Sequence, residues 1–132
     1  MTTITPTRMI EVLPKLVRSG IRDHLLDEGI AKQVEVHYTN DIETYRAMLK
    51  SKLMEEAGEV IGANTRDSMQ EEIGDLLEVL DALVKTYSLN QEDIDRTKRN
   101  KRDRSGDFNY PGTVMTGIRY YTEADNDFSQ ND

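Results

Sequence analysis

The stretch that decides the fold is NDIETYRAMLKSKLMEEAGEVIGANTRDSMQEEIGDLLEVLDALVKTY, residues 40–87 of the chain. The Asn40-Asp41 pair is a good helix cap, and the helix formers that follow predict a helix over residues 42–61. The Gly62-Ala63-Asn64 sequence ends this helix, and a second helix is expected over residues 68–87. Because the connection is short, the two helices are predicted to be antiparallel neighbours.

Apolar residues form a stripe along each of these helices. The first stripe consists of Ile42, Tyr45, Leu49, Leu53, Ala57 and Val60. The second helix carries a wider set, which spans an arc of about 160° and consists of Ile73, Leu76, Leu77, Val79, Leu80, Leu83 and Val84. One partner does not usually bury so wide an arc, so we expect several neighbours, with a second subunit as one candidate.

Weaker patterns flank the helix pair. Before it, residues 19–28 have modest helical character that stops at Gly29, and the alternating residues 32–38 fit a short strand or an extended connector. After it, Asn90 can cap a further helix over residues 91–103.

These patterns predict an all-α fold, an antiparallel helix bundle of about four helices that is completed by oligomerisation. Residues 1–12 are expected to form a flexible N-terminal segment and residues 13–110 the helical domain. Residues 111–132, polar and with some extended character over 114–121, are expected to form an extended or disordered tail.

The composition limits the class of protein. The 132 residues suit one domain, and a net charge of −8 makes a poor non-specific binder of nucleic acid or of an anionic membrane. The lack of cysteine excludes disulfides and thiolate metal sites, and two histidines are too few for a histidine-rich zinc site. With no apolar run of about 18 residues and no signal-peptide pattern, we expect a soluble cytoplasmic protein without nucleic-acid or membrane partners.

Two acidic clusters fall on the two central helices. Residues 55–59 read EEAGE and residues 71–75 read EEIGD. Each cluster holds carboxylates three residues apart, which share one face of a helix. Twelve residues separate Glu59 from Glu72, enough for one helix to end and its antiparallel neighbour to begin.

The position of these acids on the helices indicates a site. Glu56 falls inside the first apolar stripe and Glu72 falls between apolar positions of its own helix, whereas Glu59 and Asp75 lie near the stripe edges. Burying an unpaired carboxylate costs several kcal/mol, so a positive partner is needed. A hard divalent cation, Mg²⁺ or Mn²⁺, is the natural candidate because it prefers carboxylate oxygen.

Two simpler interpretations of the acids stay open. They are either solvated helix surface or members of salt bridges to Lys52 and other basic residues. Gly58 and Gly74 lie within the helices beside these acids, although glycine there costs about 1 kcal/mol relative to alanine. Close packing or room for a ligand would explain them.

Basic residues gather at the end of the last predicted helix, over residues 98–104. They suit the helix dipole there, and they also suit a clamp that neutralises a polyphosphate. Lys15 and Arg18 form a smaller basic pair near the start of the chain.

Together these motifs resemble the all-α nucleoside triphosphate pyrophosphohydrolases, the MazG-like superfamily. The pattern EExxE, a gap, then ExxD is carried by KLMEEAGEV at 52–60 and EEIGDLLEVLDAL at 71–83. KLVR at 15–18 and KRNKRDRSGDF at 98–108 resemble the phosphoribosyl-ATP pyrophosphohydrolase-like branch. The resemblance extends over roughly residues 13–110.

The resemblance implies a helical fold whose helices pair or swap between subunits, and cleavage of a nucleoside triphosphate between its α and β phosphates. Carried over by motif, the magnesium ligands are Glu56, Glu59, Glu72 and Asp75. Glu55 would be a ligand, a partner of the ligands or a base. The phosphate-binding residues would be Lys15, Arg18, Asn100, Lys101, Arg102 and Arg104.

The resulting hypothesis is a Mg²⁺-dependent hydrolase, with Mn²⁺ as a substitute, that yields a monophosphate and pyrophosphate in nucleotide-pool house-cleaning. It is expected to be a homodimer or homotetramer. Glu55 or Glu56 would accept the proton of the attacking water, and basic residues would offset charge on the departing pyrophosphate. Two alternatives stay open: a phosphoribosyl-ATP pyrophosphohydrolase, and a non-enzymatic, acidic, helical oligomeric adaptor.

Overall fold

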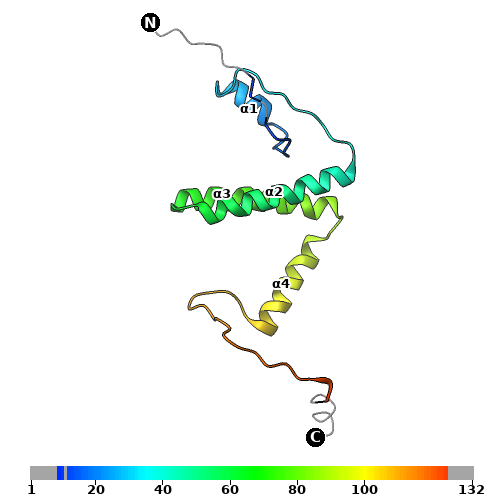
Figure 1. Ribbon diagram of the computed structural model, residues 1–132, viewed down its shortest axis with the longest axis vertical. Helices are drawn as coiled ribbons and strands as arrows, with labels where there is room; N and C mark the ends of the chain where they lie inside the picture. The colour runs from blue at the N-terminus through cyan, green and yellow to red at the C-terminus, as the bar shows by residue number, and fades with distance from the viewer. Residues whose placement is uncertain (1–8, 11, 125–132) are drawn as a thin grey trace. The chain divides into compact units, whose positions relative to one another are not determined.

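The computed structural model describes residues 9–10 and 12–124 of the chain. Figure 1 labels the helices of the described residues, which contain no strand. In chain order the helices are α1 (Ile21–Asp27), α2 (Ile42–Gly62), α3 (Arg66–Thr86) and α4 (Gln91–Ser105). The prediction of an all-α fold is therefore confirmed.

The chain divides into two compact units, one that ends at Gln91 and one that begins at Glu92. The first unit contains α1, α2 and α3, and the second contains nearly all of α4 and the chain that follows it.

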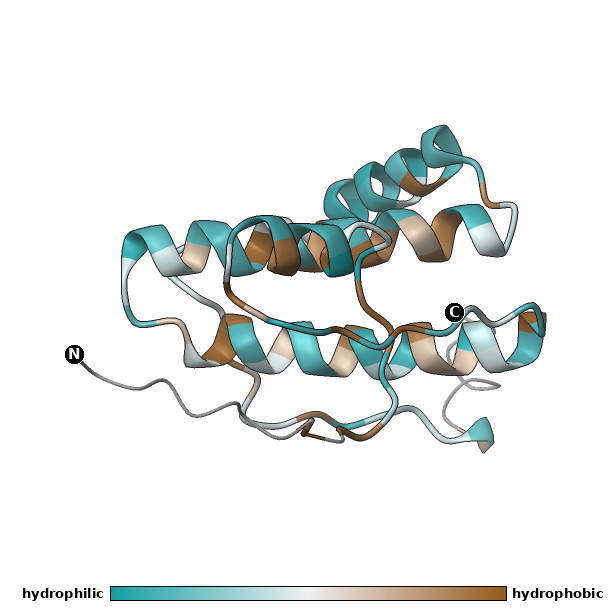
Figure 2. Ribbon diagram, turned by 90° about the horizontal axis from the view of Figure 1, so that it is seen from above, coloured by the Kyte–Doolittle hydropathy of each residue, from teal (hydrophilic) through white to brown (hydrophobic). Residues whose placement is uncertain are grey.

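The first unit is built on the packing of α2 against α3, which run side by side in Figures 1 and 2. They are antiparallel, as predicted, because the start of α2 meets the end of α3. There, Arg46 Nε donates a hydrogen bond of 3.2 Å to Thr86 Oγ1, and the same guanidinium also donates to the Thr86 carbonyl. The guanidinium carbon lies 4.5 Å from the centre of the Tyr87 ring, a cation–π contact.

Side-chain caps set the beginnings of both long helices. The Asp41 carboxylate accepts a hydrogen bond of 3.0 Å from the Thr44 backbone N–H, and the hydrogen bonds from the Thr44 side chain and backbone lower the pKa of Asp41. Thr65 Oγ1 accepts from the Ser68 backbone N–H at 3.1 Å. Because Thr65 provides this cap, α3 begins at Arg66, two residues earlier than the sequence suggested.

The apolar seam between α2 and α3 is narrow. Leu49 is 2% exposed and Val79 is 8% exposed, and they are the buried apolar residues of the described chain. Part of the wide apolar arc on α3 stays in contact with solvent, since Ile73, Leu77 and Leu80 are 41%, 54% and 38% exposed. The packing of α2 therefore buries only part of that arc.

The remaining segments are mostly irregular. Gly29 adopts a φ of +68° directly after α1, a left-handed conformation that ends the helix as predicted. Residues 32–38 form a connector with no strand, and residues 106–122 contain neither helix nor strand. The expectations for residues 1–8 and for the end of the tail, 125–132, lie outside the described residues.

The helices of the described chain lack the combination of length and apolar character that crossing a bilayer requires.

The Thr65 cap can be tested by substitution. Thr65→Ala should lower the free energy of unfolding by about 1 kcal/mol, because the Ser68 N–H loses its acceptor. Thr65→Ser keeps an acceptor oxygen and should stay close to wild type. Urea unfolding followed by helical circular dichroism measures both, and equal stability of the alanine and serine variants would contradict the cap.

Candidate metal centre

Three carboxylates meet at the interface of α2 and α3. One oxygen each from Glu56 on α2 and from Glu72 and Asp75 on α3 lie within 4.8 Å of one another. Glu56 is buried, with 8% of its surface exposed, and the other two residues are half-buried. The sequence reasoning assigned these three residues to one site, and the fold brings them together.

The helix geometry explains this meeting. Glu56 lies two turns beyond the buried Leu49 on the same face of α2, so the packing that buries Leu49 also buries the carboxylate. Glu72 and Asp75 are three residues apart and share a face of α3. An antiparallel neighbour then presents this face to Glu56.

Burial and the surrounding negative charges act together on Glu72. Burial, followed by the negative charges of Glu59, Asp75 and Glu56, raises the pKa of Glu72 above its ordinary value. Among the described residues, no hydrogen bond or ion pair is made to the Glu72 carboxylate. Glu72 is thus the member of the triad that lacks a positive partner.

Glu56 has a cation on its own helix. Lys52 Nζ lies 3.4 Å from Glu56 Oε1 and 3.3 Å from Glu55 Oε2, and the lysine side chain is only 18% exposed. This is the salt-bridge alternative that the sequence left open, and it holds for these two acids. It does not extend to the whole cluster, because Glu72 has no such partner.

Two further cations come from the segment before α1. Lys15 Nζ lies 3.5 Å from Glu55 Oε1, and Arg18 Nη2 donates a hydrogen bond of 2.7 Å to Asp75 Oδ1. Burial acts to raise the pKa of Glu55, but the hydrogen bond and charge of Lys52 and the charge of Lys15 outweigh it and lower the pKa. The structure therefore places both predicted phosphate-binding residues of this segment beside the acids.

Glu59, the fourth predicted ligand, is not a member of the triad. Glu59 is exposed on the turn of α2 after Glu56 and is not one of the three grouped acids, although its charge acts on Glu72. Its role as a ligand stays a prediction.

The predicted phosphate-binding residues of α4 all belong to the second compact unit. All are exposed, and they are Asn100, Lys101, Arg102 and Arg104. Their contribution to the same site as the triad stays a prediction.

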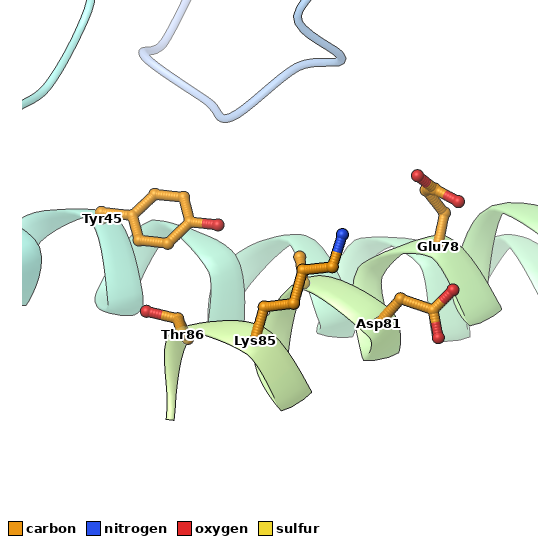
Figure 3. Close-up of a pocket in the computed structure, with 6 residues that line it drawn as sticks. Tyr45, Glu78, Asp81, Lys85 and Thr86 are labelled. Carbon is orange, nitrogen blue, oxygen red and sulfur yellow. The ribbon is translucent and has the colours of Figure 1, made fainter. Parts of the chain in front are cut away.

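A cavity of about 300 Å³ lies further along the helix pair. It is lined by Tyr45 of α2 and by residues of the second half of α3 (Figure 3), which are Glu78, Asp81, Ala82, Lys85 and Thr86. The sequence reasoning did not single out this place. Its lining carries two carboxylates and one lysine, and this excess of negative charge disfavours the binding of a polyphosphate. The cavity therefore offers no second phosphate site.

The triad fits a hard divalent cation by its chemistry. Its donors are carboxylate oxygens alone, which Mg²⁺ and Mn²⁺ prefer, and they come from two helices that hold them in place. The half-buried positions of Glu72 and Asp75 leave one side of the group open to water or to a substrate. Such a cation would also offset the burial and the neighbouring negative charges that raise the pKa of Glu72.

Comparison with known proteins found no matching family model, no matching curated protein and no matching solved structure.

The raised pKa of Glu72 predicts that the effect of its substitution on stability depends on pH. In metal-free protein at neutral pH, Glu72→Gln should raise the melting temperature, because it removes a charge that its neighbours repel. Because the pKa of Glu72 is raised in the folded state, the folded protein takes up a proton there more readily than the unfolded chain. As the pH falls through this raised pKa, wild type therefore gains stability relative to the variant. The advantage of Glu72→Gln should therefore disappear in acid.

Thermal unfolding of both proteins across a pH series, in the presence of a chelator, measures this effect. The exposed Glu35→Gln serves as the control for loss of one negative charge. A Glu72→Gln variant that is less stable than wild type at neutral pH would show that the neighbouring carboxylates do not destabilise ionised Glu72.

The two helix-interior glycines predict a separate test. A methyl group at Gly58 or Gly74 would meet nothing within 4 Å, so close packing among the described residues does not explain either one. Gly74→Ala should raise the free energy of unfolding by about 1 kcal/mol, since alanine is the better helix former. Chemical denaturation measures this, and a loss of stability would reveal a neighbour at that position.

Proposed function

We propose that the protein is a Mg²⁺-dependent nucleoside triphosphate pyrophosphohydrolase that releases a monophosphate and pyrophosphate. The observation that carries the proposal is the group formed by Glu56, Glu72 and Asp75 at the interface of α2 and α3. Lys52 and Arg18 pair with members of this group and Lys15 pairs with the adjacent Glu55, so cations lie near the place where an anionic substrate would bind. The resemblance of the acidic motifs to the MazG-like superfamily supports the same activity.

In this proposal Glu56, Glu72 and Asp75 hold Mg²⁺, and Glu59 on the next turn of α2 adds a further oxygen. The bound cation would lower the pKa of a water molecule and offset charge on the phosphates. The half-buried acids of α3 form the open side, where the substrate would approach.

Glu55 suits the role of a proton acceptor better than that of a ligand. It lies outside the triad and faces Lys52 and Lys15, which lower its pKa and keep it ionised at neutral pH. An ionised carboxylate can accept a proton, although a lowered pKa makes it a weak base. Glu56, the other candidate base, is tied to Lys52 and belongs to the metal group.

The basic residues provide the phosphate contacts. Lys15 and Arg18 already lie beside the acids, and their charges would offset the charge that develops on pyrophosphate. Asn100, Lys101, Arg102 and Arg104 on α4 are proposed to add to this set.

The proposal includes a homodimer or homotetramer that works in the cytoplasm. The half-exposed apolar residues of α3 support association, since a second copy can bury Ile73, Leu77 and Leu80. The net charge of −8 argues against nucleic acid as a partner.

Purified full-length protein, Mg²⁺ and a panel of nucleoside triphosphates, with phosphoribosyl-ATP as one member, test the activity by pyrophosphate release. Asp75→Asn and Glu72→Gln should each lower the rate at least about 100-fold, because each removes a metal ligand. The matched control Glu35→Gln should keep the full rate.

The outcomes separate the candidate functions. Hydrolysis of phosphoribosyl-ATP alone would restrict the activity to that substrate, and release of orthophosphate would mean that a different bond is cleaved. Absence of hydrolysis, together with a melting temperature that Mg²⁺ leaves unchanged, would instead favour the helical adaptor.

A further inference from the structure

We infer that Arg18 couples metal binding to phosphate binding: it neutralises Asp75 before the metal arrives, is displaced by the metal, and then contacts the substrate phosphates. The inference rests on the proposed function, because it takes Asp75 as a metal ligand. It adds an order of events, metal before nucleotide, and gives Arg18 two successive partners.

The two cations of the segment before α1 have different partners. Lys15 is paired with Glu55, which is not part of the triad, whereas Arg18 is paired with Asp75, which is. A metal ion bound by the triad therefore competes with Arg18 for one carboxylate and leaves the Lys15 pair intact. Only one of the two contacts has to break.

The ion pair between Arg18 and Asp75 is weak enough for a metal ion to displace it. Both side chains are substantially exposed, 57% for Arg18 and 35% for Asp75, so water weakens the ion pair. A divalent cation carries twice the charge of a guanidinium and interacts with three carboxylates at once. The metal is therefore the stronger partner for Asp75.

Arg18 stays close to α2 after the pair breaks, because Lys15, three residues earlier, keeps its contact with Glu55. The Arg18 carbonyl accepts a hydrogen bond of 3.1 Å from the Ile21 N–H, in the turn that leads into α1. On the other side, Pro14, Lys15 and Leu16 lie against α2, where they line a small cavity with Met48, Ser51 and Lys52. The segment on the N-terminal side of Arg18 thus stays against α2 through residues outside the triad.

A guanidinium released from Asp75 is well suited to bind phosphate. Its planar fork matches phosphate oxygens in a way that a lysine ammonium does not. The intact pair between Lys15 and Glu55 keeps it within reach of Asp75, where the proposed metal would bring the phosphates. Metal binding would thus create a phosphate ligand, and the two binding events would favour each other.

Binding measurements on the full-length protein test this without any turnover. The probes are Mn²⁺ alone, counted by electron paramagnetic resonance, and inorganic pyrophosphate, titrated by calorimetry at saturating Mn²⁺. Arg18→Gln should bind Mn²⁺ about threefold tighter, because the competing cation is gone. The same variant should bind pyrophosphate at least about threefold more weakly, because a phosphate contact is lost.

Two further variants sharpen the result. Arg22→Gln is the matched control, since Arg22 pairs with Asp23 within α1 and should change neither affinity. Arg18→Lys keeps the competing charge but loses the fork, so it should bind Mn²⁺ like wild type and pyrophosphate more weakly. Circular dichroism confirms that each variant is folded.

In Arg18→Gln, tighter binding of Mn²⁺ together with weaker binding of pyrophosphate would identify the coupling. If Arg18→Gln binds both probes more weakly, Arg18 has only a structural role and the inference is wrong. If Mn²⁺ binds wild type and Arg18→Gln equally, the competition is absent and the inference fails while the metal site stands. If wild type binds no Mn²⁺, the proposed function and the inference fail together.

Discussion

Burial of the Glu56 carboxylate between α2 and α3 is the constraint on which the rest of the site depends. The packing that excludes water from Leu49 also removes water from this charge, and a charge in that position needs compensation. Lys52 provides it from one helical turn away. With Lys52 occupied by Glu55 and Glu56, the acids of α3 depend on other cations: Arg18 supplies one to Asp75, and Glu72 is left with a raised pKa.

Much of the fold could be predicted because its signals are local. Helix formers, caps and apolar spacing specify α2, α3 and α4 within a few residues, and they predict the antiparallel pair. The predicted start of α3 at residue 68 falls two residues late, because Thr65 caps the helix and Arg66 begins it. The alternation over residues 32–38 resembled a strand, yet no neighbouring strand exists in the described chain to pair with it.

Contacts of the candidate site could be predicted only where both residues lie on one helix. The burial of Glu56 and its pairing with Lys52 follow from positions four residues apart on α2. The contact between Arg18 and Asp75 joins residues 57 apart in the chain, and no local pattern specifies it. Sequence reasoning named Arg18 as a phosphate ligand but could not place it against a carboxylate. It also grouped Glu59 with the triad, whereas the structure leaves Glu59 exposed on the following turn.

The tight connection between α2 and α3 has a consequence for how the protein acquires its site. All three acids lie within one helical hairpin, so the contacts that gather them are short-range along the chain, and such contacts form early and rapidly. The segment that holds Lys15 and Arg18 must close a much longer loop before it arrives. A folding chain would thus hold the three acids with Lys52 beside Glu56 first and gain Lys15 and Arg18 later, and divalent ions present during folding would meet Asp75 before Arg18 does.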